Sequence, residues 1–525
     1  MIKKALSVVL SAAGYACWIA GTVMFLVFND GIFFNTAVMA LIAALCIIVL
    51  PACLVTVYFI KKKKTEDNSE IKKSFGKLPF ILSAVFIAGT LASLLGLVLN
   101  GLVVNYFQPI TLSIATSVTL IVGAVLLIVG ALVFLLDKKY FLSATAAALV
   151  IVSVTAGVIW ASAQDYRDFA DGTEVSFLFA EGEEGYASFR IPSIIVMEKE
   201  VLNEKFSYDL SFDVVIAFCE GRKDSAHDTG RIDLVGKISL DGGKTFGALQ
   251  TFFTFGEEVG KVGNPTAVFD VFTGYLHMAF MRAAESEDYY YRTFTAKGKL
   301  TSYGTMEWGE IKDISLEKDE SAAPGGADGV RTDTLMVGPG KGVQITEGEK
   351  AGRIIIPASN AGFSFVLYSD DGGESWHRGA NAGEGNECEA ALLSDGTLAM
   401  VIRDNTGCTM YHPEQYQRIS YSDDGGETWY IETRETSLRT PICMSSLCTE
   451  EDGILLLSYP DSFRNRVNLT LAKSDDGGKN WTTQQLYPGA SGYSCAEYSD
   501  GTILIVAEIG KVNYSEGIVL LKLQA

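Results

Sequence analysis

The segment SDDGGETW at residues 422–429 predicts a hairpin turn, and variants of it recur along the chain. The copies are SLDGGKTF at 239–246, SDDGGESW at 369–376 and SDDGGKNW at 474–481. Ser and Asp side chains bond nearby backbone amides, and glycine supplies the positive φ that tight turns need. The last three copies begin 53 and 52 residues apart. This period is typical of radially repeated units such as propeller blades.

The paired aspartates of these turns do not fit a calcium loop. An EF-type loop needs alternating acidic ligands and a glutamate at its twelfth position. That position holds Asn381, Arg434 or Leu486 in the last three copies. We therefore expect no metal site here.

The pattern S-x-D-x-G-x-[TSN]-[WF] resembles the Asp box (BNR repeat) of the sialidase (neuraminidase) family. FRIP at 189–192 matches the F/Y-R-I-P signature of its bacterial-type members, and GPGKGVQ at 338–344 resembles a further family stretch. In that family the boxes mark outer turns of the blades, far from the catalytic centre. Strand-length apolar runs and Gly-rich turns continue from about residue 172 to the end, so the length and the period predict an all-β, six-bladed β-propeller.

Five apolar stretches precede this region, at 5–28, 36–60, 79–104, 110–136 and 141–163. Each exceeds the ~20 residues that cross a bilayer. We therefore expect the propeller to follow an α-helical transmembrane region of about five helices. The predicted domains are this region at 1–163, a linker at 164–172 and the propeller at 173–525.

Lysines predict how the five stretches would be oriented. Lys-rich loops stay in the cytoplasm, and all eleven lysines of residues 1–163 lie before the first stretch, between the second and third, or between the fourth and fifth. This predicts a multi-pass protein of the plasma membrane with a cytoplasmic N-terminus, an extracellular catalytic domain and the lipid bilayer as a partner. If the first stretch is instead a cleaved signal peptide, the exit side is unchanged.

Charge excludes one class of partner. The chain carries a formal net charge of −20, and residues 1–163 hold eleven Lys against five acids, so the remainder carries −26. An acidic domain argues against nucleic acid. It also means that any site for an anion must be a local basic pocket.

The resemblance implies three arginines that bind the carboxylate of sialic acid. Arg190 of FRIP, Arg403 in LAMVIRD and Arg466 in RVNLT match them in order. Arginine suits this task because its planar fork binds a carboxylate bidentately and stays charged. Arg464 competes with Arg466 for the third place.

The resemblance also implies a tyrosine nucleophile, Tyr493 in GASGYSC at 489–495. Sialidases are known exceptions among glycosidases in using tyrosine, because a neutral phenol can approach an anomeric centre that already carries a negative group. Its base is expected to be Glu387 in NECE at 386–389, with Glu389 as the alternative.

The expected acid/base is Asp228, in the loop HDTG at 227–230, with Asp224 as the weaker candidate. Such a group works best with a pKa raised towards the working pH. Arg222, in the family-like EGR at 220–222, is expected to line the pocket.

These residues together predict an exo-α-sialidase that hydrolyses terminal sialic acid of glycoproteins, glycolipids or oligosaccharides with retention and without a cofactor. Two alternatives remain open at this point. The chain could transfer the sugar, as a trans-sialidase or an intramolecular trans-sialidase, or it could be a non-catalytic receptor that binds sialic acid.

Overall fold

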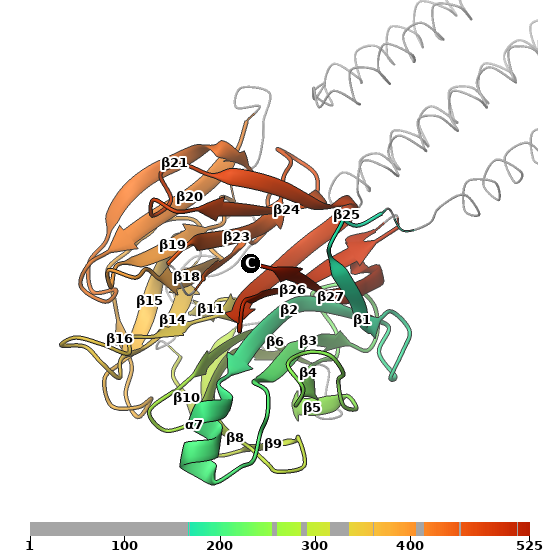
Figure 1. Cartoon of the computed structure of the whole chain (residues 1–525), viewed down its shortest axis with the longest axis vertical. Helices are drawn as coiled ribbons and strands as arrows, with labels where there is room; N and C mark the ends of the chain where they lie inside the picture. Colours follow the sequence, from blue (N-terminus) through green and yellow to red (C-terminus); the bar gives the residue numbers. More distant parts are fainter. Residues whose placement is uncertain are drawn as a thin grey trace, which may run out of the picture. The chain divides into compact units, whose positions relative to one another are not determined.

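Antiparallel strands that follow one another along the chain make up most of the structure, a computed structural model (Figure 1). It describes residues 166, 168–254, 260–284, 291–315, 335–360, 362–405, 414–450, 453–511 and 513–525. These residues belong to one compact unit, 166–408 with 414–525. The second unit, 1–165 with 409–413, lies outside the described residues.

The described strands fall into six successive groups, each with its own antiparallel pairing. The first group is β2 (Ser188–Met197), β3 (Val214–Arg222), β4 (Ile232–Ser239) and β5 (Gln250–Phe253). The second is β6 (Gly260–Phe269), β7 (Leu276–Ala284) and β8 (Arg292–Leu300), with β9 (Met306–Trp308) and β10 (Lys312–Asp313) on β8. The third is β14 (Ile354–Ser359) and β15 (Phe363–Ser369), flanked by β11 (Met336–Val337), β13 (Val343–Gln344), β16 (His377–Arg378) and β17 (Gly383–Glu384).

The remaining groups complete the order. The fourth is β18 (Cys388–Leu392), β19 (Leu398–Ile402), β20 (Tyr416–Ser422) and β21 (Tyr430–Arg439). The fifth is β22 (Ser446–Thr449), β23 (Leu455–Pro460), β24 (Val467–Ser474) and the first half of β25 (Thr482–Ser499). The sixth is the second half of β25, β26 (Thr502–Gly510), β27 (Gly517–Gln524) and β1 (Glu174–Ala180).

The innermost strands form a closed ring. Contacts run from β2 to β6, to the short strand β12 (Gly340–Lys341), to β18, β22, β25 and back to β2. The pairing of β1 with the C-terminal strand β27 joins the two ends of the described chain. Because each group contributes its inner strand to this ring, residues far apart in sequence meet near its centre (Figure 1).

The four box segments form the hairpin turns that the sequence predicts. In each, the Ser Oγ accepts from the N–H of the second glycine, at 2.7–2.9 Å. The Asp two positions after this Ser accepts further hydrogen bonds: Asp476 Oδ1 accepts from Asn480 N at 2.9 Å, and Oδ2 accepts from Asn480 Nδ2 at 2.6 Å. Gly477 and Gly478 have φ of 74° and 92°, which only glycine adopts without strain.

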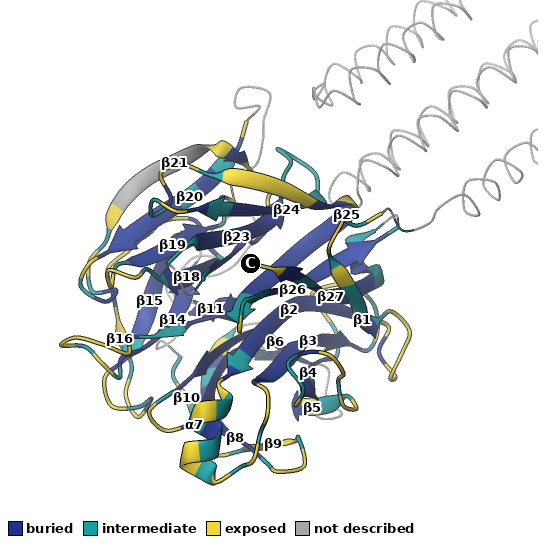
Figure 2. Ribbon diagram, viewed as in Figure 1, coloured by how far each residue is buried: buried dark blue, intermediate teal, exposed yellow. Residues whose placement is uncertain are grey.

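Apolar side chains of neighbouring groups form the core. The largest cluster lies between the first and second groups and includes Phe218, Phe253 and Phe280. Figure 2 shows buried strand interiors and an exposed surface at α7 (Lys199–Phe206) and at many loops. The fold therefore buries the inner strands and leaves many of the connecting loops exposed.

One prediction is contradicted by the structure. Among the described residues, we find no helix whose length and apolarity would let it cross a membrane. The α-helix α7 has eight residues, several of them charged, and rises about 12 Å where a bilayer core needs about 30 Å. Besides it, the described chain has the short 3-10 helix η2 (Tyr514–Glu516).

This finding corrects the predicted fold class, in which five transmembrane helices precede the propeller. It also corrects the predicted multi-pass location in the plasma membrane and the lipid bilayer as a partner. The five predicted spans themselves fall within residues 1–163, outside the described residues. The proposed domain limits at 163 and 172 stay predictions.

Candidate active site

Tyr493 lies on β25 where the pairing of this strand with β26 is irregular. The register shifts between Ser491 and Ser494, so Tyr493 occupies a bulge, a feature that re-aims side chains. Its ring is 4 % exposed and packs with Ile191, Cys443 and Met444. The bulge brings the Tyr493 hydroxyl to residues of other strand groups.

The Tyr493 hydroxyl forms hydrogen bonds with both a carboxylate and a guanidinium group. It donates to Glu387 Oε2 at 2.5 Å and accepts from Arg403 Nη1 at 2.7 Å. Arg403 also forms an ion pair with Glu387. Glu387 directly precedes β18, and Arg403 directly follows β19, so the register of these two paired strands places both groups at one end of the sheet.

The three predicted arginines converge on this tyrosine. The guanidinium carbons of Arg466, Arg190 and Arg403 lie 5.0, 5.7 and 6.0 Å from the centroid of the Tyr493 ring. Arg190 and Arg466 also lie 4.8 and 5.0 Å from the ring of Tyr514. A cluster of three cations at one place in a chain of net charge −20 makes a local site for an anion.

Burial sets the charge state of Tyr493. Burial raises its pKa well above the usual value, and the charge of Glu387 acts in the same direction, while Arg403 and Arg466 lower it. The phenol is therefore neutral at rest, with its proton directed at Glu387. The arrangement keeps the proton on the phenol and places a carboxylate acceptor beside it.

Glu508 on β26 is a further member of the site. Its Oε1 accepts from Arg190 Nε at 2.7 Å and from Ile191 N at 2.8 Å. Its Oε2 accepts from Arg190 Nη2 at 3.2 Å and from Tyr493 N at 3.0 Å. Ile191 has a φ of 59°, which is rare for a β-branched residue and stores strain. One buried carboxylate thus fixes both the first arginine and the backbone of the tyrosine.

Asp228 lies in the loop between β3 and β4, with its carboxylate 72 % exposed. Its Oδ1 is 2.7 Å from Nη2 of Arg222, which is 1 % exposed. Glu220 holds Arg222 in place: its Oε2 accepts from Arg222 Nε and Nη2 at 3.0 and 2.6 Å.

The pKa of Asp228 lies below its usual value in this arrangement, whereas a general acid/base works best with a raised one. Partial burial raises the pKa, but the charges of Arg222, Lys261 and Arg190 outweigh that effect and hold it well below its usual range. Asp228 is thus present as a carboxylate paired with Arg222.

The alternative candidates lie elsewhere. Glu389 is fully buried and bonds to Ser446 and Leu447. Asp224 pairs with Arg231 through both oxygens. Arg464 is partly buried in the turn before β24, where its backbone N–H donates to Ser462 Oγ.

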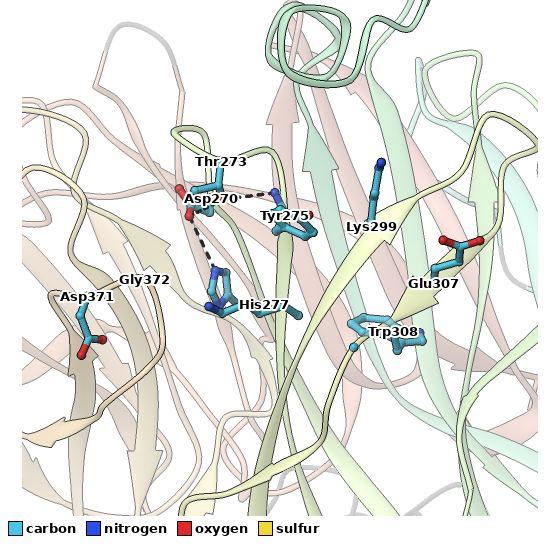
Figure 3. A pocket seen from close by; sticks show the side chains of 11 residues that line it. Asp270, Thr273, Tyr275, His277, Lys299, Glu307, Trp308, Asp371 and Gly372 are labelled. Carbon is cyan, nitrogen blue, oxygen red and sulfur yellow. Dashed lines mark hydrogen bonds and ion pairs between the residues drawn. The ribbon is translucent and has the colours of Figure 1, made fainter.

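A separate cleft of about 660 Å³ lies between β7, β8 and β9 and the box turn at Asp371 (Figure 3). None of the seven predicted site residues lines it. The cleft lies at the box end of the strands. On β15, Ser369 belongs to the box, whereas Ser364 lies near the site, because its Oγ donates to the carbonyl of Asn386, the neighbour of Glu387. Five residues of strand separate the two ends by about 17 Å.

Sequence reasoning missed Glu508, Glu220 and Tyr514. One signal was available for Glu508, which is the lone acid in the apolar run TILIVAEIG at 502–510. A charged residue in such a strand is rarely buried without a partner. The partner is Arg190, which lies 318 positions away, so the local sequence does not reveal it.

The fold and this site define a class of β-propeller with a basic centre built around a tyrosine. Residues 216–515 match the family described as BNR repeat-like domain. The matched part covers more than half of the chain. The chain belongs to the sialidase family of BNR repeat-like proteins, of the bacterial type.

Individual relatives agree with this assignment. A sialidase of Bacteroides fragilis is 26 % identical over 359 residues, which cover 61 % of this chain and 59 % of that protein. The chain thus spans less than two thirds of this curated relative.

Two solved structures share the fold. The Hadza microbial sialidase Hz136 matches with a TM-score of 0.54 and 22 % identity, over 67 % of this chain and 68 % of that one. The Trypanosoma rangeli sialidase in complex with 2,3-difluorosialic acid, a covalent intermediate, matches with a TM-score of 0.53 and 18 % identity, over 68 % of this chain and 60 % of that one.

Proposed function

We propose that this chain is an exo-α-sialidase that releases terminal sialic acid from glycoproteins, glycolipids or oligosaccharides with retention of configuration. The observation that carries this proposal is the convergence of Arg190, Arg403 and Arg466 on Tyr493, whose hydroxyl donates to Glu387. Sialic acid carries a carboxylate on its anomeric carbon, and planar guanidinium groups are suited to bind it. The family assignment supports the same reading.

In the first step, the arginines would hold the sugar carboxylate over the Tyr493 ring. The Tyr493 oxygen forms a bond to the anomeric carbon as its proton passes to Glu387. The bond between that carbon and the glycosidic oxygen breaks. Arg403, which contacts both Tyr493 and Glu387, stabilises the negative charge that develops on the phenol oxygen.

Asp228, once it has left Arg222 and bound a proton from solvent, would pass that proton to the leaving oxygen. It would then take a proton from the water that attacks the anomeric carbon; the bond between that carbon and the Tyr493 oxygen breaks, sialic acid is released, and Glu387 returns its proton to Tyr493. To hold that proton, Asp228 must leave Arg222. Asp228 is the partner that can move, because it lies on an exposed loop while Arg222 is buried and bonded to Glu220.

The direct test is turnover of 4-methylumbelliferyl α-sialoside by the wild-type chain and by Tyr493→Phe. We expect the variant to lose about 10³-fold or more of kcat, because no other oxygen occupies this position. Tyr498→Phe is the matched control, since Tyr498 lies on the same strand but packs in a separate apolar cluster. Equal turnover by wild type and Tyr493→Phe would refute the mechanism.

Product analysis with sialyllactose separates hydrolysis from transfer. Free sialic acid is the expected product. Transfer to added lactose would identify a trans-sialidase, and a 2,7-anhydro product would identify an intramolecular one. Binding without any turnover would identify a receptor.

A further inference from the structure

A second charged cluster lies at the centre of the inner ring, apart from the residues assigned above. It consists of Lys341 on β12, Glu389 on β18 and Glu497 on β25. Lys341 and Glu389 are 4 % and 0 % exposed, and the Glu497 side chain is 18 % exposed. Strand β12 contacts β2, β6, β18 and β25, so this axial cluster joins several blades.

Glu389 is surrounded by hydrogen-bond donors. Its Oε1 accepts from Ser446 Oγ at 2.5 Å and from Leu447 N at 3.0 Å. Its Oε2 accepts from Lys341 N at 3.3 Å and lies 3.7 Å from Cys495 Sγ. The close approach of β12 requires glycine at position 340, where a Cβ would lie 2.0 Å from Glu389 Oε2. The fold has built a specific place for this side chain.

The axial cluster holds two carboxylates and one ammonium group. Lys341 Nζ is 3.6 Å from Glu497 Oε2. Among the described residues, the other groups near Glu389 are Ser446 and Cys448 of β22, Cys388 of its own strand, Cys495 of β25 and, through Cys495, Ser193 of β2. None of them supplies a second positive charge. Because an uncompensated charge inside a protein is costly, the cluster favours one bound proton.

The pKa values agree with this count. Burial raises the pKa of Glu389 to about 7, although the charge of Lys341 and the hydrogen bonds from Ser446, Leu447 and Lys341 act to lower it. Burial also raises the pKa of Glu497, against the charge of Lys341. Glu497 is the member that reaches solvent and gives the proton a path of exchange.

The axial cluster shares its strands with the proposed catalytic pair. Glu389 follows Glu387 by two positions, and Cys495 and Glu497 follow Tyr493 by two and four. Close contacts join the same two chain segments at both places. The Tyr493–Glu387 bond at one level is therefore followed by the Cys495–Glu389 contact at the next.

We propose that Lys341, Glu389 and Glu497 form a buried site that holds one exchangeable proton, and that this proton sets the upper pH limit at which the Tyr493–Glu387 pair works. The second half rests on the proposed function. Loss of the proton leaves an uncompensated negative charge beneath Glu387 and Tyr493. That charge opposes ionisation of the phenol, so catalysis declines as pH rises.

The first test measures the proton without any activity. The melting temperature is recorded between pH 5 and pH 8 for wild type, Glu389→Gln and the control Glu374→Gln, which removes an exposed carboxylate paired with Lys297 and Lys312. A group whose folded pKa is raised loses stability as pH increases through that pKa. We expect wild type and Glu374→Gln to lose stability over this range, and Glu389→Gln to show a flatter dependence.

A second variant keeps the test decisive if Glu389→Gln fails to fold. Glu497→Gln also leaves one carboxylate for one ammonium group and should flatten the same dependence. Parallel curves for wild type and whichever of these two variants folds would overturn the proton site.

The second test is the pH profile of kcat/KM. For each protein, kcat/KM at pH 8 is divided by its value at acidic pH. Because pH 8 is one unit above the pKa of Glu389, this ratio should be about tenfold higher for Glu389→Gln than for wild type. An unchanged alkaline limb beside a flattened stability curve would overturn the link to catalysis and leave the proton site standing. If no sialoside is turned over, the proposed function fails, while the melting curves still decide on the proton.

Discussion

Tyr493 shows how side-chain surroundings decide chemistry at the scale of one residue. A buried phenol alone is an inert hydrophobic group with a raised pKa. Here its hydroxyl lies between a carboxylate and a guanidinium, and two more guanidinium groups face its ring. The same residue type at Tyr487, whose hydroxyl donates to a backbone carbonyl of Gly510, has a structural role.

The geometry of the arginine fork is testable at Arg466. Its Nε and Nη2 donate to the Ile442 carbonyl at 3.2 and 3.0 Å, which aims the group at the Tyr493 ring. Arg466→Lys keeps the charge but loses the fork, so we expect kcat/KM to fall about 10–100-fold, equivalent to about 1.4–3 kcal/mol. Steady-state kinetics on the sialoside measure this change.

Arg464→Lys is the matched control, because it makes the same change two residues away. It should alter kcat/KM far less than Arg466→Lys once both proteins are shown to be folded. Equal losses in the two variants would mean that Arg466 has no special place in binding.

At the scale of the element, turns and bulges differ in where their backbone hydrogen-bond partners come from. The box turns satisfy their own backbone amides through one Ser and one Asp, so they are self-contained. The bulge on β25 and the strained Ile191 on β2 instead depend on Glu508 of β26. The bulge and the strained Ile191 therefore lie at the site end of their strands, and the box turns occupy the other end.

Replacing a box aspartate should affect stability and spare activity. Asp476→Ala removes the acceptor of the Ser474, Lys479 and Asn480 bonds, and we expect the melting temperature to fall by about 2–6 °C. Asp475→Ala is the control, since Asp475 is exposed and has no hydrogen bond to the described residues. A drop in kcat/KM without loss of stability would contradict the scaffold role of the turn.

The closed ring explains the site at the scale of the whole molecule. Arg190, Glu387, Arg403, Arg466 and Tyr493 are spread over some 300 positions, and the ring of inner strands brings them together. The ring also encloses the axial cluster. The molecule thus has a basic centre above a buried acidic pair.

This layout predicts an optimum of stability at about pH 4 to 5. Hydrogen bonds from Asn480 lower the pKa of Asp476 to about 2, and bonds from Ser239 and Thr245 lower that of Asp241 to about 2 despite partial burial. Groups with lowered pKa lose their contribution as pH falls below their usual value towards 2. Glu389 acts on the other side, since stability declines as pH rises from its usual 4.5 through about 7, by at most about 1.4 kcal/mol per pH unit.

Urea unfolding at pH 2.5, 5.5 and 8.5 measures both sides of this optimum. The unfolding midpoint should be highest at pH 5.5. A midpoint that rises steadily from pH 2.5 to pH 8.5 would show that the buried acid at the axis does not hold its proton.

Local sequence patterns predicted the box turns and the residues of the candidate site, because each pattern lies within a short segment. The Ser, Asp and Gly of each box make bonds within eight residues, and FRIP and GASGYSC carry Arg190 and Tyr493. Glu508 and the axial cluster escaped prediction because their partners come from distant strands. The pairing of Asp228 with Arg222 escaped because it depends on how a loop lies against a strand, and the predicted helical membrane region was contradicted.

The most direct test of the central claim is covalent trapping with 2,3-difluorosialic acid, followed by intact-protein and peptide mass spectrometry. The account predicts that wild type loses fluoride from C2 of the reagent and gains one 3-fluorosialosyl group on the peptide that contains Tyr493, and that Tyr493→Phe gains none. A label on another residue, or an equal label in Tyr493→Phe, would contradict the claim that the arginine cluster presents the sugar to this tyrosine.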